Sequence, residues 1–363
     1  MKKQKYLLFL LVSLCTLVLV ACGGDKANSG EKEVSGDSSD SGETYELNAN
    51  FSASASSDFI KQVAEPWAEY VEEKSEGRIK INVYSGAALG SLSSGYADIE
   101  AGVYEVGFII PGLHSDTDAF PMTIGDIPFL LQSPDIVPKV LGPFIEKYGQ
   151  ISEDVTYLGV TSTDAYQIFG QEPIKSVSDL KNKKVSDSVA GRIELLKTLN
   201  ATPVSMSNAD LYEALERGLT DFAVYTGVGG IGYKFDEVTK WMTKVDMAVS
   251  NMPFYINTDA FESLPQDLQD LMLNDLGPKF NQLCTDMYTA TATKNIGTYE
   301  EHVGANGGGV YVPTEAEFAE WKAPIKKQME DWVAEANKRG YEGQAMMDYY
   351  VELLESAGVE VPK

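Results

Sequence analysis

Apolar and polar residues alternate in two short segments near the start of the main body of the chain, with a helical pattern between them. Tyr45–Asn50 and Arg78–Tyr84 alternate with a period of two, which predicts strands. From Ser57 to about Lys74, apolar side chains recur along one helical stripe, and Pro66 is expected to kink this helix. The segment therefore predicts a strand, a helix and a second strand.

The alternation of strands and helices continues through the middle of the chain. The glycine- and serine-rich loop Ser85–Gly95 leads to a short helix, and a helical turn is expected at Asp179–Asn182. Strands are expected at Val106–Ile110, Val155–Thr161, Lys184–Ser186, Thr202–Val204 and Asp221–Tyr225, and helices at Ile193–Leu199 and Asn208–Glu216. Closely spaced strand–helix units are typical of mainly parallel sheets that helices cover.

The last third of the chain, from Pro265 onward, is mainly helical in pattern. One long amphipathic segment runs to about His302, and Gly277-Pro278 is expected to interrupt it. The remaining elements are expected to be a strand at Val310–Val312 and helices at about Glu315–Lys338 and Gln344–Ala357. All of these helical stripes are explained by packing into a core.

The N-terminal segment combines a basic start with an apolar stretch that ends at a cysteine. Lysines follow Met1, apolar residues run from Tyr6 to Val20, and Cys22 follows a small residue. This is the pattern of a secretory signal peptide, and the stretch is shorter than the roughly 20 apolar residues of a membrane-spanning helix. The ending resembles the bacterial lipobox, which implies that residues 1–21 are removed and that Cys22 carries a lipid. An ordinary signal peptide beside a chance cysteine is the alternative.

Residues 22–44 are rich in serine, glycine and charged side chains and have almost no apolar ones. Such a segment cannot bury enough surface to offset the entropy lost on ordering, so it predicts a disordered tether. The chain is therefore expected to be exported and anchored to the outer face of the cell membrane by the lipid on Cys22, with its folded part beginning near Tyr45.

Composition narrows the range of partners and of stabilising bonds. The formal net charge of −25 argues against nucleic acid and other polyanions as partners. About 320 residues follow the tether, enough for two lobes with separate cores. Only Cys284 remains besides the lipidated cysteine once the signal peptide is removed, so no internal disulfide is possible.

No constellation of residues in the sequence points to catalysis, a cofactor or a metal. His114 and His302 lie far apart in the sequence, and Cys284 sits within a helical pattern as a small apolar residue. Gly227–Gly232 fits the spacing of a dinucleotide-binding loop, but it comes late in the chain, and an inter-lobe or cleft loop is the better interpretation. An exported hydrolase that uses two carboxylates stays an alternative.

Several segments, taken in order, carry a family resemblance. They are Glu76–Tyr84 with Leu89-Gly90, Asp126–Leu130, Pro173–Ser176 with Asp179–Val185, Leu211–Gly218 with Asp221, Tyr233–Trp241, Asn257 and Leu264-Pro265. Together they resemble the DctP-type solute-binding proteins of tripartite ATP-independent periplasmic (TRAP) transporters. The resemblance covers about Tyr45 to Glu301.

The resemblance implies a two-lobed α/β fold of the periplasmic-binding-protein kind, similar to type II, with hinge-crossing strands and a long lobe-spanning helix. Lobe I is expected at residues 45–164 plus about 250–290, and lobe II at residues 165–249 plus about 291–363. A ligand would lie in the cleft between the lobes, and a hinge motion would close the cleft.

The residues expected at the ligand site depart from the family pattern. Where the family usually has an arginine that holds the ligand's carboxylate, this sequence has Ser186, followed by Asp187. Either the ligand is not a simple carboxylate but an aromatic, uncharged or cationic solute, or Arg192 supplies the positive charge from the start of a helix. A solvated surface role for Arg192 is the plain alternative. The ligand-binding residues implied by the resemblance, with Arg192, are Phe51, Pro111, Tyr166, Ser186, Val189, Arg192, Asn208 and Tyr225.

The resemblance implies an extracytoplasmic receptor that has no enzymatic activity and needs no cofactor or metal. It would capture a small organic solute and deliver it to the membrane subunits of a TRAP-type permease. A sensory lipoprotein that passes its ligand to a signalling partner, and the exported hydrolase above, are the alternatives.

Overall fold

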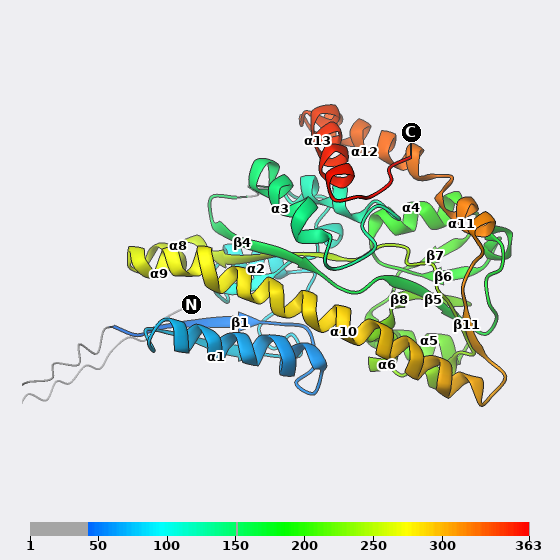
Figure 1. Ribbon diagram of the computed structural model, residues 1–363, viewed down its shortest axis with the longest axis horizontal. Coiled ribbons are helices and arrows are strands. Elements are labelled where there is room, and N and C mark those ends of the chain that lie inside the picture. The colour runs from blue at the N-terminus through cyan, green and yellow to red at the C-terminus, as the bar shows by residue number, and fades with distance from the viewer. Residues whose placement is uncertain (1–42, 150–151, 363) are drawn as a thin grey trace, which may run out of the picture. The chain divides into compact units, whose positions relative to one another are not determined.

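The computed structural model describes residues 43–149 and 152–362. They belong to one compact unit that begins at Glu43 (Figure 1). The predicted signal peptide, Cys22 and all but the last two residues of the predicted tether lie outside the described residues. Among the residues that are described, no helix is both long enough and apolar enough to cross a membrane.

The first sheet has five strands in the order β2-β1-β3-β10-β4. Strand β1 pairs in parallel with β2 and β3, whereas β10 pairs antiparallel with β3 and β4. The strands are β1 Tyr45–Asn50, β2 Ile79–Tyr84, β3 Val106–Phe108, β4 Val155–Ser162 and β10 Asn251–Asn257. Four of these were predicted within a residue or two at each end; β10 was not.

The second sheet has six strands in the order β11-β9-β5-β8-β6-β7. Strand β6 is parallel to β7 and β8, but β5 is antiparallel to β8 and β9. The strands are β5 Tyr166–Gly170, β6 Lys184–Ser186, β7 Thr202–Val204, β8 Phe222–Thr226, β9 Trp241–Thr243 and β11 Gly309–Tyr311. The prediction of mainly parallel sheets is thus only partly right, because β5 and β10, which receive the chain from the other sheet, run against their neighbours.

Helices and helical turns surround both sheets. The α-helices are α1 Glu65–Lys74, α2 Gly95–Glu100, α3 Val137–Tyr148, α4 Ala190–Thr198, α5 Leu211–Glu216, α6 Gly227–Gly232, α7 Phe235–Val238, α8 Thr258–Glu262, α9 Gln266–Leu271, α10 Gly277–Gly304, α11 Glu315–Lys322, α12 Ile325–Lys338 and α13 Gly343–Ser356. Two π-helical segments, η1 Ile60–Ala64 and η6 Met272–Leu276, lead into α1 and α10. The short 3₁₀ turns are η2 Pro111–Leu113, η3 Phe120–Asp126, η4 Val177–Leu180 and η5 Asn208–Asp210.

Helix α10 runs past both sheets as one element of 28 residues (Figure 1). Its buried Phe280 and Cys284 belong to the core on the first sheet, and its buried Tyr299 and Val303 belong to a cluster on the second. The long lobe-spanning helix predicted from the family resemblance is therefore present. The interruption predicted at Gly277-Pro278 corresponds to the end of the π-helical η6, because α10 begins at Gly277. Proline is tolerated in this first turn, where its missing N–H costs little.

The glycine-rich run Gly227–Gly232, predicted as a loop, is helix α6. The Thr226 hydroxyl caps it by accepting a hydrogen bond from the Gly229 N–H at 2.9 Å. The glycines let this helix lie against aromatic side chains: a Cβ added to Gly230 would come within 2.6 Å of the Phe169 ring. The glycine content of Gly227–Gly232 is therefore explained by close packing of the helix, and not by the conformational freedom of a loop.

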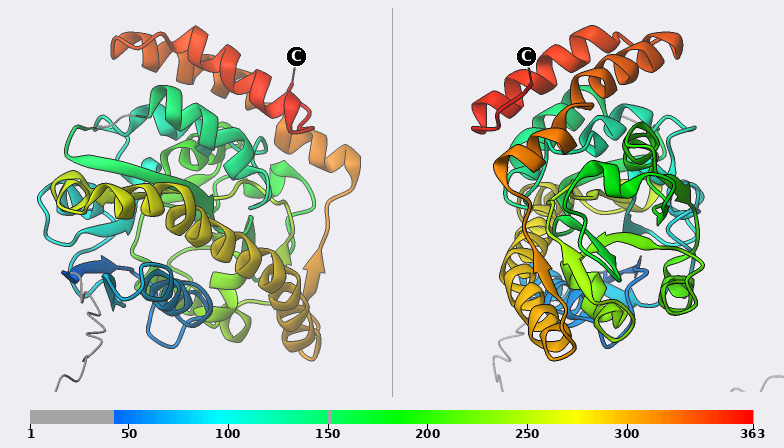
Figure 2. Two further views of the ribbon diagram at one scale, coloured as in Figure 1. Left: turned by 60° about the vertical axis from the view of Figure 1, so that its left-hand side comes forward. Right: turned by 90° about the vertical axis from the view of Figure 1, so that its right-hand side faces the viewer.

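The C-terminal helix α13 packs over α3, and α12 packs against α13 and η3 (Figure 2). The Trp332 indole N–H donates to the Thr123 hydroxyl at 2.9 Å, and the Tyr350 ring packs edge-on against Phe144 of α3. These contacts join residues 325–356, assigned to lobe II from the sequence, to elements within the predicted range of lobe I. The single helix predicted over Glu315–Lys338 is divided near Pro324 into α11 and α12.

Candidate functional site

Two chain segments cross between the sheets side by side. Residues 163–165 join β4 to β5, and residues 244–250 join β9 to β10. They are bonded to each other through Thr163 N–H to Ser250 O at 3.0 Å, Tyr166 N–H to Ala248 O at 2.8 Å and Met247 N–H to Tyr166 O at 2.9 Å. The two crossings form a short antiparallel ribbon, and side chains on it lie where the two lobes meet.

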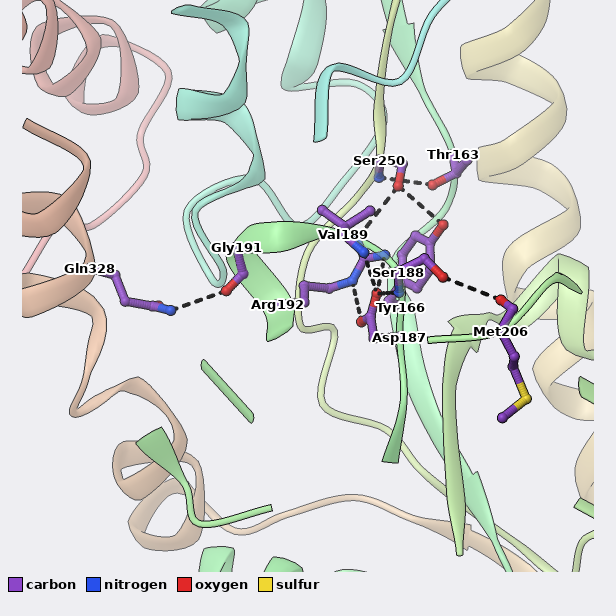
Figure 3. A network of polar contacts seen from close by, with 10 residues as sticks. All are labelled: Thr163, Tyr166, Asp187, Ser188, Val189, Gly191, Arg192, Met206, Ser250 and Gln328. Carbon is purple, nitrogen blue, oxygen red and sulfur yellow. Dashed lines mark hydrogen bonds and ion pairs between the residues drawn. The ribbon is translucent and has the colours of Figure 1, made fainter. Parts of the chain in front are cut away.

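Beside this ribbon, Arg192 of α4 forms a buried, bidentate ion pair with Asp187 (Figure 3). The guanidinium Nε and Nη2 donate to the two carboxylate oxygens at 2.7 and 3.0 Å. Asp187 also accepts the backbone N–H groups of Ser188 and Val189 at 2.7 and 3.0 Å. Both side chains are at most 2% exposed. The charge of Arg192 is therefore matched within the protein itself.

The Arg192 guanidinium also lies flat over the Tyr166 ring, with Cζ 3.7 Å from the ring centroid. Ser250 joins the two: its hydroxyl donates to Tyr166 Oη at 3.1 Å and accepts from Arg192 Nη1 at 3.5 Å. Burial raises the pKa of Tyr166, so the phenol stays neutral. A solvated surface role for Arg192 is wrong, since the residue is only 2% exposed. Its role toward a ligand stays a prediction.

Asp126 of η3 lies at the seam between the lobes. A Cβ added to Gly112 would lie 2.7 Å from both Asp126 Oδ2 and Val189 Cγ1, and one added to Gly191 would lie 2.7 Å from the Asp126 carbonyl oxygen. Asn251 donates to Asp126 Oδ1 at 2.8 Å. Burial raises the pKa of Asp126 to about 7, and the Arg192 charge opposes that rise.

Aromatic side chains continue the site across the second sheet. Tyr225 of β8 packs against Tyr166 with ring centroids 6.1 Å apart, and against Tyr233 and Phe235 at 5.5 Å. Tyr166 and Tyr225 are half-buried. Burial raises the pKa of Tyr225 well above its ordinary value. This side of the site is thus an uncharged aromatic wall.

The remaining predicted ligand residues fall in different surroundings. Ser186 ends β6 and is 3% exposed, Val189 is 4% exposed at the seam, and Pro111 is buried next to Gly112. Phe51 lies in the core of the first sheet, with its ring 5.9 Å from that of Phe280. Asn208 is exposed on η5. The structure therefore gathers Pro111, Tyr166, Ser186, Val189, Arg192 and Tyr225 near the seam, and leaves Phe51 and Asn208 apart from the ion-pair network.

Two residues of this cluster were not proposed as ligand-site residues from the sequence. Asp126 opens one of the family-like segments but carried no sign of burial, and Asn251 lies in a strand that the pattern did not predict. Asp164, on the first crossing, was also missed; it accepts the Val228 N–H of α6 at 3.0 Å, and burial raises its pKa to about 7.

A groove of about 560 Å³ lies elsewhere, between α3, β4 and α10. Glu146, Gly159 and Asn281 are among the residues that line it. None of the predicted ligand residues lines this groove. Within residues 43–149 and 152–362, no group of three or more histidine, cysteine, aspartate or glutamate side chains is placed to hold a metal ion.

Comparison with known families identifies the fold. The profile of the DctP family, described as bacterial extracellular solute-binding protein, family 7, matches residues 51–336. The chain belongs to this family. The resemblance drawn from the sequence motifs is thereby confirmed.

Relatives of this solute-binding family are distant in sequence. A solute-binding protein of Albidiferax ferrireducens is 22% identical over 223 residues, which cover 60% of this chain and 65% of that protein. The chain thus spans slightly less than two thirds of the length of this curated relative.

Solved structures of the family share the whole fold. A TRAP solute-binding protein from Rhodoferax ferrireducens, in complex with copurified benzoate, superposes with a TM-score of 0.77 at 19% identity, covering 87% of this chain and 99% of its own. A marine metagenome TRAP protein specific for aromatic acid ligands, in complex with metahydroxyphenylacetate, gives 0.78 at 21% identity, with 86% and 99% covered. The predicted two-lobed α/β fold is confirmed.

Proposed function

We propose that this protein is the extracytoplasmic receptor of a TRAP-type transporter. It captures a small organic solute between its two lobes and delivers it to a membrane permease. The observation that carries this proposal is the buried polar network of Arg192, Asp187, Tyr166 and Ser250, which lies where two crossing strands join the lobes. A solute held there would contact both lobes and favour their closure.

The chemistry of the network bears on the class of solute. Asp187 occupies the Nε–Nη2 edge of the Arg192 guanidinium, and Tyr166 covers one of its faces. The arginine therefore has little capacity left for a second carboxylate. Ser186, in the position of the usual arginine, offers only a hydroxyl. We therefore favour an aromatic, uncharged or cationic solute over a simple carboxylate. Two structurally similar proteins bind aromatic acids. The ring of such a ligand would suit the half-buried Tyr166 and Tyr225, but its carboxylate would not suit a site in which Asp187 already pairs with Arg192.

We further propose that a lipid on Cys22 anchors the receptor to the outer face of the cell membrane, through the tether formed by residues 22–44. The anchor would keep the receptor near its permease while the tether lets it reorient. Loss of membrane association on Cys22→Ala substitution, with the folded unit intact, tests this anchor; an unchanged membrane fraction contradicts it.

We propose that the receptor binds its solute without converting it. A hydrolase would release a product from the bound solute, whereas a receptor returns it unchanged after denaturation. Mass spectrometry of the released solute separates the two functions.

A thermal-shift screen of the unit from Glu43 onward tests the proposed function. A solute at about 100 times its Kd should stabilise the fold by roughly 2.7 kcal/mol. We expect aromatic, neutral or cationic solutes to shift the midpoint, and dicarboxylates and sialic-acid-like sugar acids to shift it little. A strong response to those acids alone would leave a receptor but contradict the proposed solute class, and no response to any solute would contradict the receptor function.

A further inference from the structure

Beside the Arg192–Asp187 pair, two buried hydrogen-bond acceptors have no donor within the described part of the chain. Asp126 Oδ2 and Asn251 Oδ1 are buried and have no hydrogen-bond partner among the described residues. The two side chains are adjacent, because the Asn251 amide donates to the other oxygen of Asp126 at 2.8 Å. Asp126 is 2% exposed and Asn251 is fully buried. Buried polar atoms normally have a partner, so two adjacent acceptors without one point to a donor that comes from elsewhere.

The charges around these acceptors favour a positively charged donor. Two carboxylates, Asp126 and Asp187, face a single guanidinium, and Asp187 takes both of its closest bonds. When both carboxylates are ionised, one negative charge in this buried cluster has no partner, and an unpaired buried charge is costly. An ammonium group supplies both the missing charge and several N–H donors.

The position of Asp126 gives a solute access to it when the lobes separate. Its free oxygen lies near Gly112 of η2, and a Cβ added to Gly112 would lie 2.7 Å from both this oxygen and Cγ1 of Val189, which precedes α4. Gly112 and Val189 fall within the ranges expected for lobe I and lobe II. Separation of the lobes would therefore uncover the carboxylate, and closure would bury it against a bound solute.

We infer that Asp126 is the ligand-binding carboxylate of this receptor and that it takes the ammonium group of an amine-bearing solute, with Asn251 Oδ1 as the second acceptor. This inference rests on the proposed receptor function and reverses the polarity of a site built to hold a carboxylate. The amine would donate to Asp126 Oδ2 and Asn251 Oδ1 and would hold the Asp126 carboxyl in its ionised form.

Isothermal titration calorimetry with matched solutes tests this inference. The probes are benzylamine against benzoate, tyramine against 4-hydroxyphenylacetate, and putrescine against succinate, each titrated into the wild-type unit from Glu43 onward. We expect at least one amine to bind at least about tenfold more tightly than its paired acid, the ratio that corresponds to about 1.4 kcal/mol. An acid preferred in every pair that binds would overturn the inference and leave the receptor function standing.

Two variants assign the preference to Asp126. D126N keeps the shape of the side chain and removes its charge, and should weaken amine binding at least about tenfold. The control E146Q removes an exposed carboxylate from α3, at the separate groove, and should change amine binding less than about twofold. Amine binding unchanged in D126N would overturn the inference.

Failure of the inference and failure of the proposed function give different results. If no probe binds and no solute is found in the purified protein, both fall. If a carboxylic acid copurifies and D126N retains it, only the inference falls. Should D126N not fold, the wild-type preference within the matched pairs decides by itself.

Discussion

The Arg192–Asp187 pair shows how a single side chain changes the character of a site. The family resemblance implies that Ser186 stands where the family usually has an arginine, and it leaves open whether Arg192 replaces that arginine. The structure buries Arg192, but turns it toward Asp187 and the Tyr166 ring. A buried guanidinium with a bidentate carboxylate partner organises its surroundings and is poorly placed to be the main anchor of an anionic ligand.

Removing one partner of this pair should be costly. We expect Asp187→Ala to destabilise the fold by about 3–5 kcal/mol, because it leaves the Arg192 charge buried and unpaired and removes the acceptor for two backbone N–H groups. Urea unfolding followed by circular dichroism measures the change. The control is Glu213→Ala, which breaks an exposed pair with Arg217 and should cost less than about 1 kcal/mol. Equal losses in the two variants would contradict a buried, energetically important pair.

Asp126 should make stability depend on pH. Burial raises its pKa to about 7 in the folded protein, above the value of 3.8 for a free side chain, so the folded state holds a proton that the unfolded state has released. This contribution is fully present below about pH 4 and is lost as pH rises toward 7 and above. The Asp126→Asn variant lacks this loss. We therefore expect its stability relative to the wild type to increase by at least about 1 kcal/mol as the pH is raised from 5 to 8.

Unfolding midpoints at the two pH values measure this gain. The control is Asp270→Asn, which replaces an exposed carboxylate on α9 and should differ from the wild type by a similar amount at both pH values. A difference for Asp126→Asn that stays constant with pH would show that the carboxyl is ionised throughout.

The sequence predicted the site unevenly at the scale of residues. Tyr166, Ser186 and Val189, expected from the family resemblance, lie at the seam with Arg192, which was considered as a substitute for the missing arginine. Their contacts with a ligand stay predictions. Asp126 could not be found, because its environment is made by Gly112, Gly191 and Asn251, which approach it from distant parts of the chain. Local pattern carries no information about such an approach.

At the scale of elements, glycines set how closely the lobes approach each other. Gly191 lies in the first turn of α4 and faces the Asp126 backbone of η3. We expect Gly191→Ala to destabilise the fold by about 1–3 kcal/mol, because the new methyl group would lie 2.7 Å from a carbonyl oxygen and push α4 away from η3. Thermal unfolding measures the loss, and small-angle scattering detects an accompanying separation of the lobes.

Gly297→Ala is a matched control, since Gly297 also lies in a helix, α10, and a Cβ there meets nothing within 4 Å. This substitution should be neutral or stabilise by up to about 1 kcal/mol, as alanine does in place of glycine within helices. If the two variants behave alike, the contact between α4 and η3 does not limit closure.

Elements with a strong local pattern were the ones the sequence could predict. Alternation identified β1 and β2 within one residue, whereas β10 was missed because all of its residues are buried and no alternation remains. The prediction of a loop at Gly227–Gly232 was wrong for a different reason. Six residues rich in glycine favour a loop on propensity, and only the packing of α6 against Phe169 makes them a helix.

The two lobes of the molecule are joined by the ribbon of crossing strands and by α10, so their relative motion must bend these connections. The C-terminal helices α12 and α13 add a further link. Helix α13 packs over α3, α12 packs against η3, and Gln328 of α12 donates to the Gly191 carbonyl of α4 at 3.2 Å. The sequence could predict the number of lobes from the family resemblance. The sequence could not predict where these helices pack, because an apolar stripe shows that a helix is buried on one side but not which surface it packs against.

The central claim, that a small organic solute is captured between the lobes, is tested most directly by mass spectrometry of the purified protein. Protein expressed in an organism that supplies the solute is analysed intact under native conditions and again after denaturation. We predict one small solute per chain, bearing an amine, released unchanged on denaturation and absent from D126N. A protein that carries no solute and binds none from a broad panel would contradict the account.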